Sequence, residues 1–281
     1  MMQSLATSLR VLSTFTEVDA DLGVVEVAGR CGLTKSQTSK VMAALRRDGF
    51  LDQDAKTRRF RVGLRAYVVG SRFLSQNALC REATPIMRFL VDRSGHSTRL
   101  SVVDRDRVIY LMAIEGPLLL DTPWRAGTVL PWHATSAGRV LLAAQEDAEA
   151  DAILARHGVA RVTPLTVTDP DRLRRLRDEV RSRGYSAVRS ESTPGLGAIS
   201  VPVLGTSQAV VASLSLTFPD HSVPESDEPR LVAALHEAAR LLSMRIGAVV
   251  YSPLLHPSAS SGGAAQPSAA APARRRKGAA A

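Results

Sequence analysis

The chain has 281 residues, of which 45% are hydrophobic, 22% charged and only 4% aromatic. This length fits about two domains, and the ordinary apolar fraction excludes wholesale disorder. No segment approaches the roughly 18 consecutive apolar residues of a membrane helix, and no secretory signal peptide is visible. Two cysteines, Cys31 and Cys80, cannot build a disulfide scaffold or a four-cysteine zinc site. We therefore expect a cytoplasmic protein that makes no membrane contact.

The net charge of +9 is unevenly distributed along the chain. Residues 1–73 carry twelve basic and seven acidic side chains, whereas residues 74–251 carry twenty of each. Within the first zone, residues 30–65 concentrate ten basic groups against three acidic ones. Such a local excess is the electrostatic footprint of a module that binds a polyanion, although a solvated helix face would also carry it.

The first helices of the chain are predicted from apolar spacing and from a terminating glycine. In a helix over residues 8–17, Leu9, Leu12 and Phe15 fall near one face. A short second helix over residues 24–31 ends at Gly32, a residue type that favours the end of a helix.

A third helix and a hairpin follow. Thr34 and Gln37 have the spacing of a capping box, which predicts a helix over 35–48 that stops at Gly49. The strand-like segments 50–53 and 58–62 flank a polar turn and predict a hairpin. This order of elements predicts a winged helix-turn-helix domain over residues 1–63, joined by a linker helix over 64–76 to the rest of the chain.

The third helix has the two faces that a DNA-reading helix needs. Thr38, Val41, Met42 and Leu45 share one face at about 100° per residue. The opposite side presents small, hydrogen-bonding and basic residues, which suit base edges and phosphates in a major groove. The predicted DNA-binding residues are Ser36, Gln37, Ser39, Lys40 and Arg47 on this helix and Arg58 and Arg59 in the wing. The plainer alternative is a helix pair that only packs a small domain.

Residues 77–251 alternate strand-like and helical segments and predict a second domain. The segment 130–143 (LPWHATSAGRVLLA) indicates a strand end that enters a helix capped by Thr135 or Ser136. The segment 194–203 (PGLGAISVPV) indicates a loop leading into a strand that pairs with residues 210–218. The last zone, residues 252–281, is rich in Ala, Ser, Pro and Gly, and we expect a disordered basic tail. This tail could contact DNA phosphates, bind another partner or have no function, and the sequence does not decide among the three.

These motifs, taken together in order and spacing over residues 5–250, resemble the IclR family of bacterial transcriptional regulators. The resemblance rests on GLTKSQTSKVMAALRRDGFL, TRRFRVG, LPWHATSAGRVLLA, TDPDRLRRLRDEVRSRGYS and PGLGAISVPV. It implies an α+β protein, in which an N-terminal winged helix binds DNA and dimerises. It further implies a C-terminal GAF-like domain, an antiparallel sheet with helices, that binds a small organic acid. Such proteins are usually homodimers or homotetramers on palindromic double-stranded operators, as repressors or activators.

The resemblance also implies where the effector lies. The matching positions are Leu119, Leu130, Ser136, Ala137, Val188, Ala198, Ser215 and Thr217. Small residues at the start of the helix after Ala134 would let an anion approach its positive end. Some members carry an acidic residue and a cysteine where this chain has Val188 and Ala198. We therefore expect an effector with an apolar or aromatic body and one carboxylate.

Other functions have weaker support in the sequence. His133 and Ser136 are close along the chain, but no third group orients them, and the six histidines lack metal-ligand spacing. Gly195 and Gly197 do not complete a dinucleotide-binding motif. We expect neither enzyme activity nor a cofactor or metal. The alternative hypothesis is a small-molecule sensor or enzyme whose basic N-terminus contacts RNA or protein.

Overall fold

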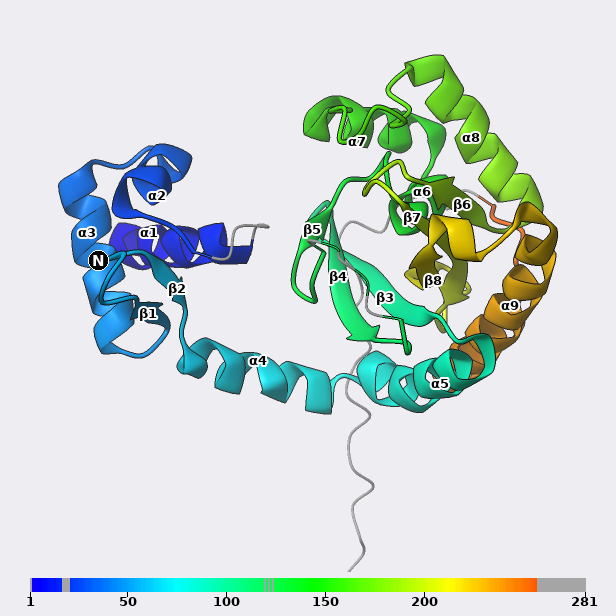
Figure 1. The fold of residues 1–281 in the computed structure, drawn as a ribbon, viewed down its shortest axis with the longest axis horizontal. Coiled ribbons are helices and arrows are strands. Elements are labelled where there is room, and N and C mark those ends of the chain that lie inside the picture. The colour runs from blue at the N-terminus through cyan, green and yellow to red at the C-terminus, as the bar shows by residue number, and fades with distance from the viewer. Residues whose placement is uncertain (1, 17–20, 119, 121, 123, 257–281) are drawn as a thin grey trace, which may run out of the picture.

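The computed structural model describes residues 2–16, 21–118, 120, 122 and 124–256, arranged as an N-terminal head and a C-terminal domain joined by one helix (Figure 1). The expectation for residues 257–281 lies outside the described residues. The N-terminal head contains α1 (Met2–Ser13), a 3-10 turn (Thr14–Thr16), α2 (Val24–Cys31), α3 (Lys35–Arg47), β1 (Leu51–Gln53) and β2 (Phe60–Val62). This is the expected winged helix-turn-helix order.

Local signals set the turn between α2 and α3. Gly32 ends α2 in the left-handed conformation, with φ of 61°. Two residues later Thr34 caps α3, because its hydroxyl oxygen accepts a hydrogen bond from the Gln37 N–H. The Thr34 N–H in turn donates to the side-chain oxygen of Gln37, which confirms the predicted capping box. The hairpin pairs Leu51 with Val62 in antiparallel register. The recognition-helix prediction therefore holds at the level of its fold.

The predicted inner face of the first helix was partly wrong. Helix α1 begins at Met2 rather than at residue 8, and Val11 is fully buried while Leu9 is 56% exposed. Phe15 is buried as expected, but it lies in the 3-10 turn. Because a 3-10 turn has about 3.0 residues per turn instead of 3.6, the α-helical spacing used for the prediction does not extend to Phe15.

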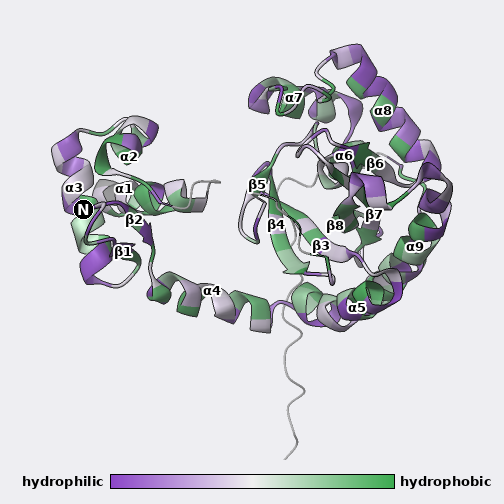
Figure 2. Ribbon diagram, viewed as in Figure 1, coloured by the Kyte–Doolittle hydropathy of each residue, from purple (hydrophilic) through white to green (hydrophobic). Residues whose placement is uncertain are grey.

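Helix α4 (Leu64–Gln76) spans the gap between the two parts, as predicted. None of its residues is buried, although many are apolar, and Figure 2 shows hydrophobic (green) positions along its ribbon. Gly63, just before it, lies against the backbone of Gly49, where an added Cβ would come within 2.4 Å of a carbonyl oxygen. The helix therefore leaves the head at a tightly packed point and then runs exposed to solvent.

The C-terminal domain is built on one antiparallel sheet with strand order β5-β4-β3-β8-β7-β6. Its strands are β3 (Ser97–Asp104), β4 (Arg107–Ile114), β5 (Val129–Leu130), β6 (Ser186–Arg189), β7 (Leu196–Leu204) and β8 (Val210–Pro219). Its helices are α5 (Ala78–Ser94), α6 (Ser136–Ala143), α7 (Asp147–His157), α8 (Pro170–Arg183) and α9 (Glu228–Arg245), with short 3-10 turns at 220–222 and 225–227. The fold class is α+β, as expected.

The two faces of this sheet differ in chemistry. Strand residues such as Leu100, Leu214 and Leu216 point toward α5 and α9 and form the main core with them. Alternate residues on the same strands are polar, because successive side chains in a strand point to opposite faces. Helix α6 lies over this second, polar face. The sheet therefore separates an apolar core from a polar surface that one short helix covers.

The first residues after the C-terminal domain extend its packing. The sequence placed residues 252–256 in the tail, yet Leu255 is buried beside Val140 and Val180, and its N–H donates to the Arg181 carbonyl. Pro253 lies against Gly184. These contacts tie the short segment to the domain, and an argument from the composition of all thirty residues overlooks them. In the described part of the chain, no helix combines the length and apolarity needed to span a bilayer.

The core assignment predicts a selective loss of stability. Leu214→Ala removes a fully buried side chain, and should lower the free energy of unfolding by about 2–5 kcal/mol. Leu165→Ala, at a position that is 63% exposed, should change it by no more than about 0.5 kcal/mol. Both tryptophans lie in the C-terminal domain, so urea denaturation followed by tryptophan fluorescence reports on this domain. Equal effects of the two substitutions would contradict the assignment.

Candidate functional site

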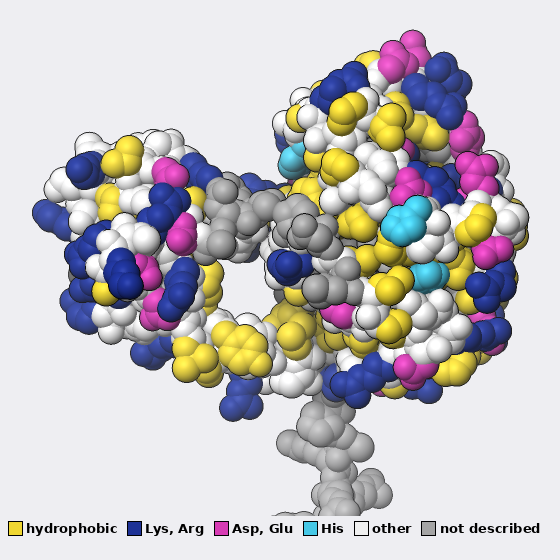
Figure 3. Space-filling model, viewed as in Figure 1, with side chains coloured by type: hydrophobic (Ala, Val, Ile, Leu, Met, Phe, Trp, Pro, Cys, Tyr) yellow, Lys and Arg dark blue, Asp and Glu magenta, His cyan; other side chains and the backbone are white. Residues whose placement is uncertain are grey.

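The outward face of α3 exposes the residues that the sequence predicts to contact DNA. Ser36, Ser39, Lys40 and Arg47 are exposed, whereas the opposite face packs into the head, where Thr38 and Met42 are fully buried. Figure 3 shows Lys and Arg side chains gathered over this head. The geometry thus presents cations and hydroxyls on a helix that nothing in the described chain covers.

Gln37 is exposed but its side chain is already partly engaged. Its Oε1 accepts hydrogen bonds from the backbone N–H and the hydroxyl of Thr34, at 3.1 and 3.0 Å. The amide group therefore serves the helix cap through its oxygen, and only its nitrogen remains to donate outward. Gln37 therefore has a structural role in the cap of α3 besides its predicted contact with DNA.

The two wing arginines lie in different environments. Arg58 is exposed in the turn, at a left-handed φ of 62°. Arg59 instead binds Asp21 through Nε and donates from Nη2 to the Asp21 carbonyl and to Glu26 at 2.9 Å. These hydrogen bonds to Asp21 and Glu26 raise the pKa of Arg59. Arg58 is free to reach a nucleic acid, whereas the charge of Arg59 is largely compensated within the head.

A cavity in the described part of the C-terminal domain, the central pocket, lies between the polar sheet face and the start of α6. Seven of the eight predicted effector residues line it: Leu130, Ser136, Ala137, Val188, Ala198, Ser215 and Thr217. Leu119 lies outside the described residues. Ser215 and Thr217 share a face of β8, as their spacing predicted. Residues that are far apart in the sequence therefore meet around one space.

The hydroxyls of Ser101, Ser136 and Ser215 form the serine floor of the central pocket, and Ser200, which does not line the pocket itself, joins two of them. Ser200 donates to Ser136 at 2.7 Å and lies 2.6 Å from Ser215, which connects α6, β7 and β8. Ser101, on the neighbouring strand β3, also lines the pocket, and its buried hydroxyl has no hydrogen-bond partner among the described residues. An unsatisfied buried hydroxyl costs stability, so this floor favours a ligand that offers polar groups.

The sequence interpretation missed the charged residue in the pocket, Arg99 on β3. Its guanidinium makes a two-point ion pair with Glu115, with distances of 2.5 and 2.9 Å, and lies 5.3 Å from the ring centre of Tyr110. These bonds from Arg99 lower the pKa of Glu115, which therefore stays ionised. Polar residues at 97, 99 and 101 alternate along this strand, and that period of two was the available signal.

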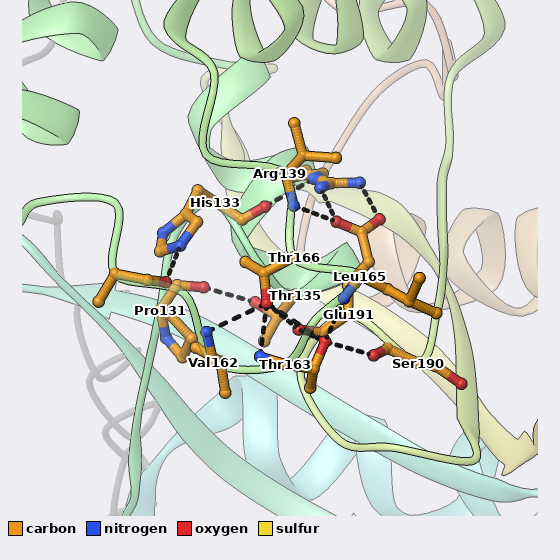
Figure 4. Close-up of polar contacts among 12 residues, drawn as sticks. Pro131, His133, Thr135, Arg139, Val162, Thr163, Leu165, Thr166, Ser190 and Glu191 are labelled. Atoms are coloured by element: carbon orange, nitrogen blue, oxygen red, sulfur yellow. Dashed lines mark hydrogen bonds and ion pairs between the residues drawn. The ribbon is translucent and has the colours of Figure 1, made fainter.

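Helix α6 is fixed against the pocket by a second buried pair. Thr135 caps the helix through the Gly138 N–H, and Gly138 packs so tightly on the Trp132 carbonyl that an added Cβ would come within 2.5 Å. Arg139 donates from Nη1 and Nη2 to Glu191 at 2.9 and 2.5 Å and from Nε to the His133 carbonyl (Figure 4). Only 5% of the Arg139 side chain is exposed.

The same carboxylate organises the loop that follows β6. Glu191 accepts from the Val167 N–H, and its carbonyl accepts from the hydroxyl of Thr166 at 2.7 Å. The next residues, Ser192 and Thr193, line the central pocket. The Arg139–Glu191 pair therefore holds α6 and one wall of the pocket in a fixed relation (Figure 4).

The hydrogen bonds of His133 and Ser136 do not pair them as base and nucleophile. His133 Nε2 bonds the Ala160 carbonyl at 2.9 Å, while the Ser136 hydroxyl bonds Ser200. Burial lowers the pKa of His133, so its ring is neutral at pH 7. Among the described residues, no cluster of three or more His, Cys, Asp or Glu side chains could hold a metal ion.

Two family profiles cover most of the chain. The profile described as the IclR helix-turn-helix domain matches residues 4–55, and that of the bacterial transcriptional regulator IclR C-terminal domain matches residues 71–244. The chain belongs to the IclR family of transcriptional regulators.

Individual relatives agree with this assignment. The regulator KdgR of Escherichia coli is 30% identical over 82% of this chain and 87% of its own length, and the E. coli regulator XynR is 28% identical over 88% and 98%. An IclR regulator from Alicyclobacillus acidocaldarius has the same fold, with a TM-score of 0.76 and 29% identity over 87% of this chain and 99% of its own. An IclR homologue from Microbacterium hydrocarbonoxydans, solved with 4-hydroxybenzoate, has a TM-score of 0.69 and 28% identity over 86% and 98%.

The buried Arg139–Glu191 pair predicts a large effect of one isosteric change in this IclR-family domain. Glu191→Gln leaves Arg139 without a carboxylate in a buried site, and should lower the free energy of unfolding by about 3–5 kcal/mol in urea denaturation. The control is Glu179→Gln, whose partner Arg172 and own side chain are nearly half exposed, and which should cost at most about 1 kcal/mol. Similar costs for both would show that burial of the pair is unimportant.

The unequal environments of the wing arginines predict unequal roles on DNA. Arg58→Ala should reduce the slope of log affinity against log salt concentration by about 0.9, the value for one lost phosphate contact. Arg59→Ala should leave this slope unchanged, because Asp21 and Glu26 already bind its guanidinium. Fluorescence anisotropy on labelled promoter DNA measures both slopes. An equal reduction for Arg59→Ala would mean that its ion pairs open when DNA binds.

Proposed function

We propose that this IclR-family protein is a ligand-responsive regulator that binds operator DNA through α3 and the wing. The observation that supports this most directly is the exposed face of α3, where Ser36, Ser39 and Lys40 stand outward on a basic head. Ser36, Gln37, Ser39 and Lys40 would contact base edges, and Arg47 and Arg58 would contact phosphates. Arg59 does so only if its internal ion pairs open. We expect the protein to work in the cytoplasm, where its DNA target lies.

We propose further that two or four copies bind a palindromic operator together. Helix α4 exposes Leu64, Tyr67, Val69 and Phe73 to between 46% and 72%, and α1 exposes Leu5 to 65%. Monomeric proteins rarely leave such apolar stretches in water, and a second copy of the same helices would cover them. Two heads held in this way would match the two half-sites of a palindrome.

The effector that fits this proposal is a small organic acid with an apolar or aromatic body. Leu130, Ala137 and Val188 supply apolar walls to the central pocket, and Trp124 and Tyr110 supply aromatic ones. The cavity has a volume of about 60 Å³, less than the roughly 150 Å³ of an engineered cavity that admits benzene. A ring-containing acid would therefore enter only with movement of the pocket walls, and this links binding to a change of shape.

Regulation would follow from this coupling between effector binding and movement of the pocket walls. An effector shifts DNA affinity only by binding the DNA-competent and DNA-incompetent arrangements unequally. Helix α4 is the continuous connection between the head and the C-terminal domain, so wall movements would reach the head through it. No catalytic step is part of this proposal.

Gel shifts with the intergenic DNA beside the protein's own gene test the proposal. A sequence-specific shift that an aromatic acid strengthens or weakens supports a ligand-responsive regulator. Binding to RNA or to a protein, with no preference for any promoter fragment, would instead support the alternative of a sensor with a basic contact arm.

Lys40 provides the sharpest single-residue test of the DNA-binding surface. Lys40→Ala should weaken binding to the operator by about 1–3 kcal/mol, because it removes an exposed cation from the groove-facing side of α3. The matched control is Arg88→Ala, which removes one exposed cation from α5 in the C-terminal domain and should not change affinity. Circular dichroism establishes that both variants fold. Undiminished binding by the Lys40 variant would remove it from the interface.

A further inference from the structure

The central pocket contains a full positive charge that is hidden from water. Arg99 lines the cavity, yet only 4% of its side chain is exposed. Arg99 on β3 pairs with Ser215 on β8, so its side chain lies on the same face of the sheet as the serine floor. A guanidinium removed from water in this way requires an anion beside it, and leaving it bare is strongly unfavourable.

Glu115 supplies the anion beside Arg99, but unlike Arg99 it is largely exposed to water. Glu115 follows the end of β4 and is 53% exposed, and it is not among the residues that line the central pocket. Its carboxylate also accepts from the Ser97 hydroxyl at 3.0 Å. If the pair opens, water can solvate Glu115, but Arg99 remains buried without a counter-charge. The pair can therefore open readily only when another anion binds Arg99.

We propose that Arg99 binds the carboxylate of the effector and that Glu115 is an internal competitor, which the effector displaces. This inference rests on the proposed function, because it assigns a chemical partner within the proposed effector pocket. Arginine is suited to the task because its planar donors hold a carboxylate at two points, as they hold Glu115 here.

The start of α6 is the weaker anchor for the same carboxylate. A helix N-terminus carries about half a unit of positive charge, whereas Arg99 carries a whole one. The groups at this terminus are also partly engaged, since Thr135 accepts from the Gly138 N–H and the Ser136 hydroxyl accepts from Ser200. The carboxylate therefore belongs at Arg99, and the body of the effector belongs against Ser136 and Ala137.

An internal competitor makes the pocket selective for charge. A neutral ligand cannot replace Glu115, because it would leave the buried Arg99 without an anion. An acid can replace it, and the released Glu115 is hydrated. The pocket should therefore discriminate between an acid and its uncharged amide more sharply than apolar contacts alone allow.

Titration calorimetry on the full chain tests this with benzoate and 4-hydroxybenzoate, each compared with its amide. Glu115→Gln should bind the acids about tenfold more tightly and the amides unchanged, because the competing charge is gone. Arg99→Gln should bind the acids about ten- to a hundredfold more weakly, again with the amides unchanged. The matched control is Glu237→Gln, which opens an exposed pair with Arg93 between α9 and α5, beyond the opposite face of the sheet, and should change nothing.

Each other result would overturn the proposal. Unchanged or weaker acid binding by Glu115→Gln excludes a competitor, and wild-type acid binding by Arg99→Gln excludes Arg99 as the anchor. If Arg99→Gln does not fold, Arg99→Lys is measured instead. This variant should bind the acids more weakly than wild type and should still prefer each acid to its amide. Absence of acid binding to both wild type and Glu115→Gln also overturns it. Operator binding by the same preparations distinguishes failure of this proposal from failure of the proposed function. If the protein binds its operator specifically but Arg99 does not bind the acid, the DNA-binding part of the proposed function remains intact.

Discussion

Arg99 and Arg139 are two of the buried arginines in the C-terminal domain, and each has a carboxylate beside it. Arg139 has Glu191, itself only 12% exposed, whereas Arg99 has Glu115, which is 53% exposed. Both members of the first pair are largely buried, and the pair connects α6 to the loop after β6. In the second pair, the half-exposed Glu115 is the partner that we propose a ligand replaces. The same electrostatic requirement thus gives a rigid wall on one side of the pocket and a replaceable contact on the other.

In the N-terminal head, by contrast, most cations are exposed to water rather than buried beside a carboxylate. Its cations on α3 remain in water, where they cost little and can exchange solvent for phosphate. Arg59 is the exception, because Asp21 and Glu26 bind it and thereby connect the wing to the start of α2. Within a basic segment, the charge count therefore overstates the number of groups available to DNA. The structure separates cations that stabilise the head from cations that face outward.

Sequence reasoning succeeded where the determining interactions are local. The helix-turn-helix follows from Gly32, Thr34 and Gln37, all within a few residues of one another. The pocket depends on strand pairing across the chain, such as Arg99 opposite Ser215, and no local pattern specifies that register. The resemblance to a family supplied Ser215 and Thr217, but it could not supply Arg99, whose importance comes from burial. Alternation along β3 could place Arg99 on the same face as Ser97 and Ser101, but the burial of its charge is a property of the assembled sheet.

The sheet explains how one small domain can hold both a stable core and a responsive pocket. Leu214 and Leu216 face the core from β8, while Ser213, Ser215 and Thr217 alternate with them on the other side. Because the core face is closely packed by α5 and α9, a ligand that moves the polar face meets resistance from the strands. The movable parts are then the elements that close the pocket, including Trp124, whose indole N–H donates to Thr193 across two loops. A ligand on Arg99 would therefore act on the loop that carries Trp124, while the strands and the Arg139–Glu191 pair stay in place.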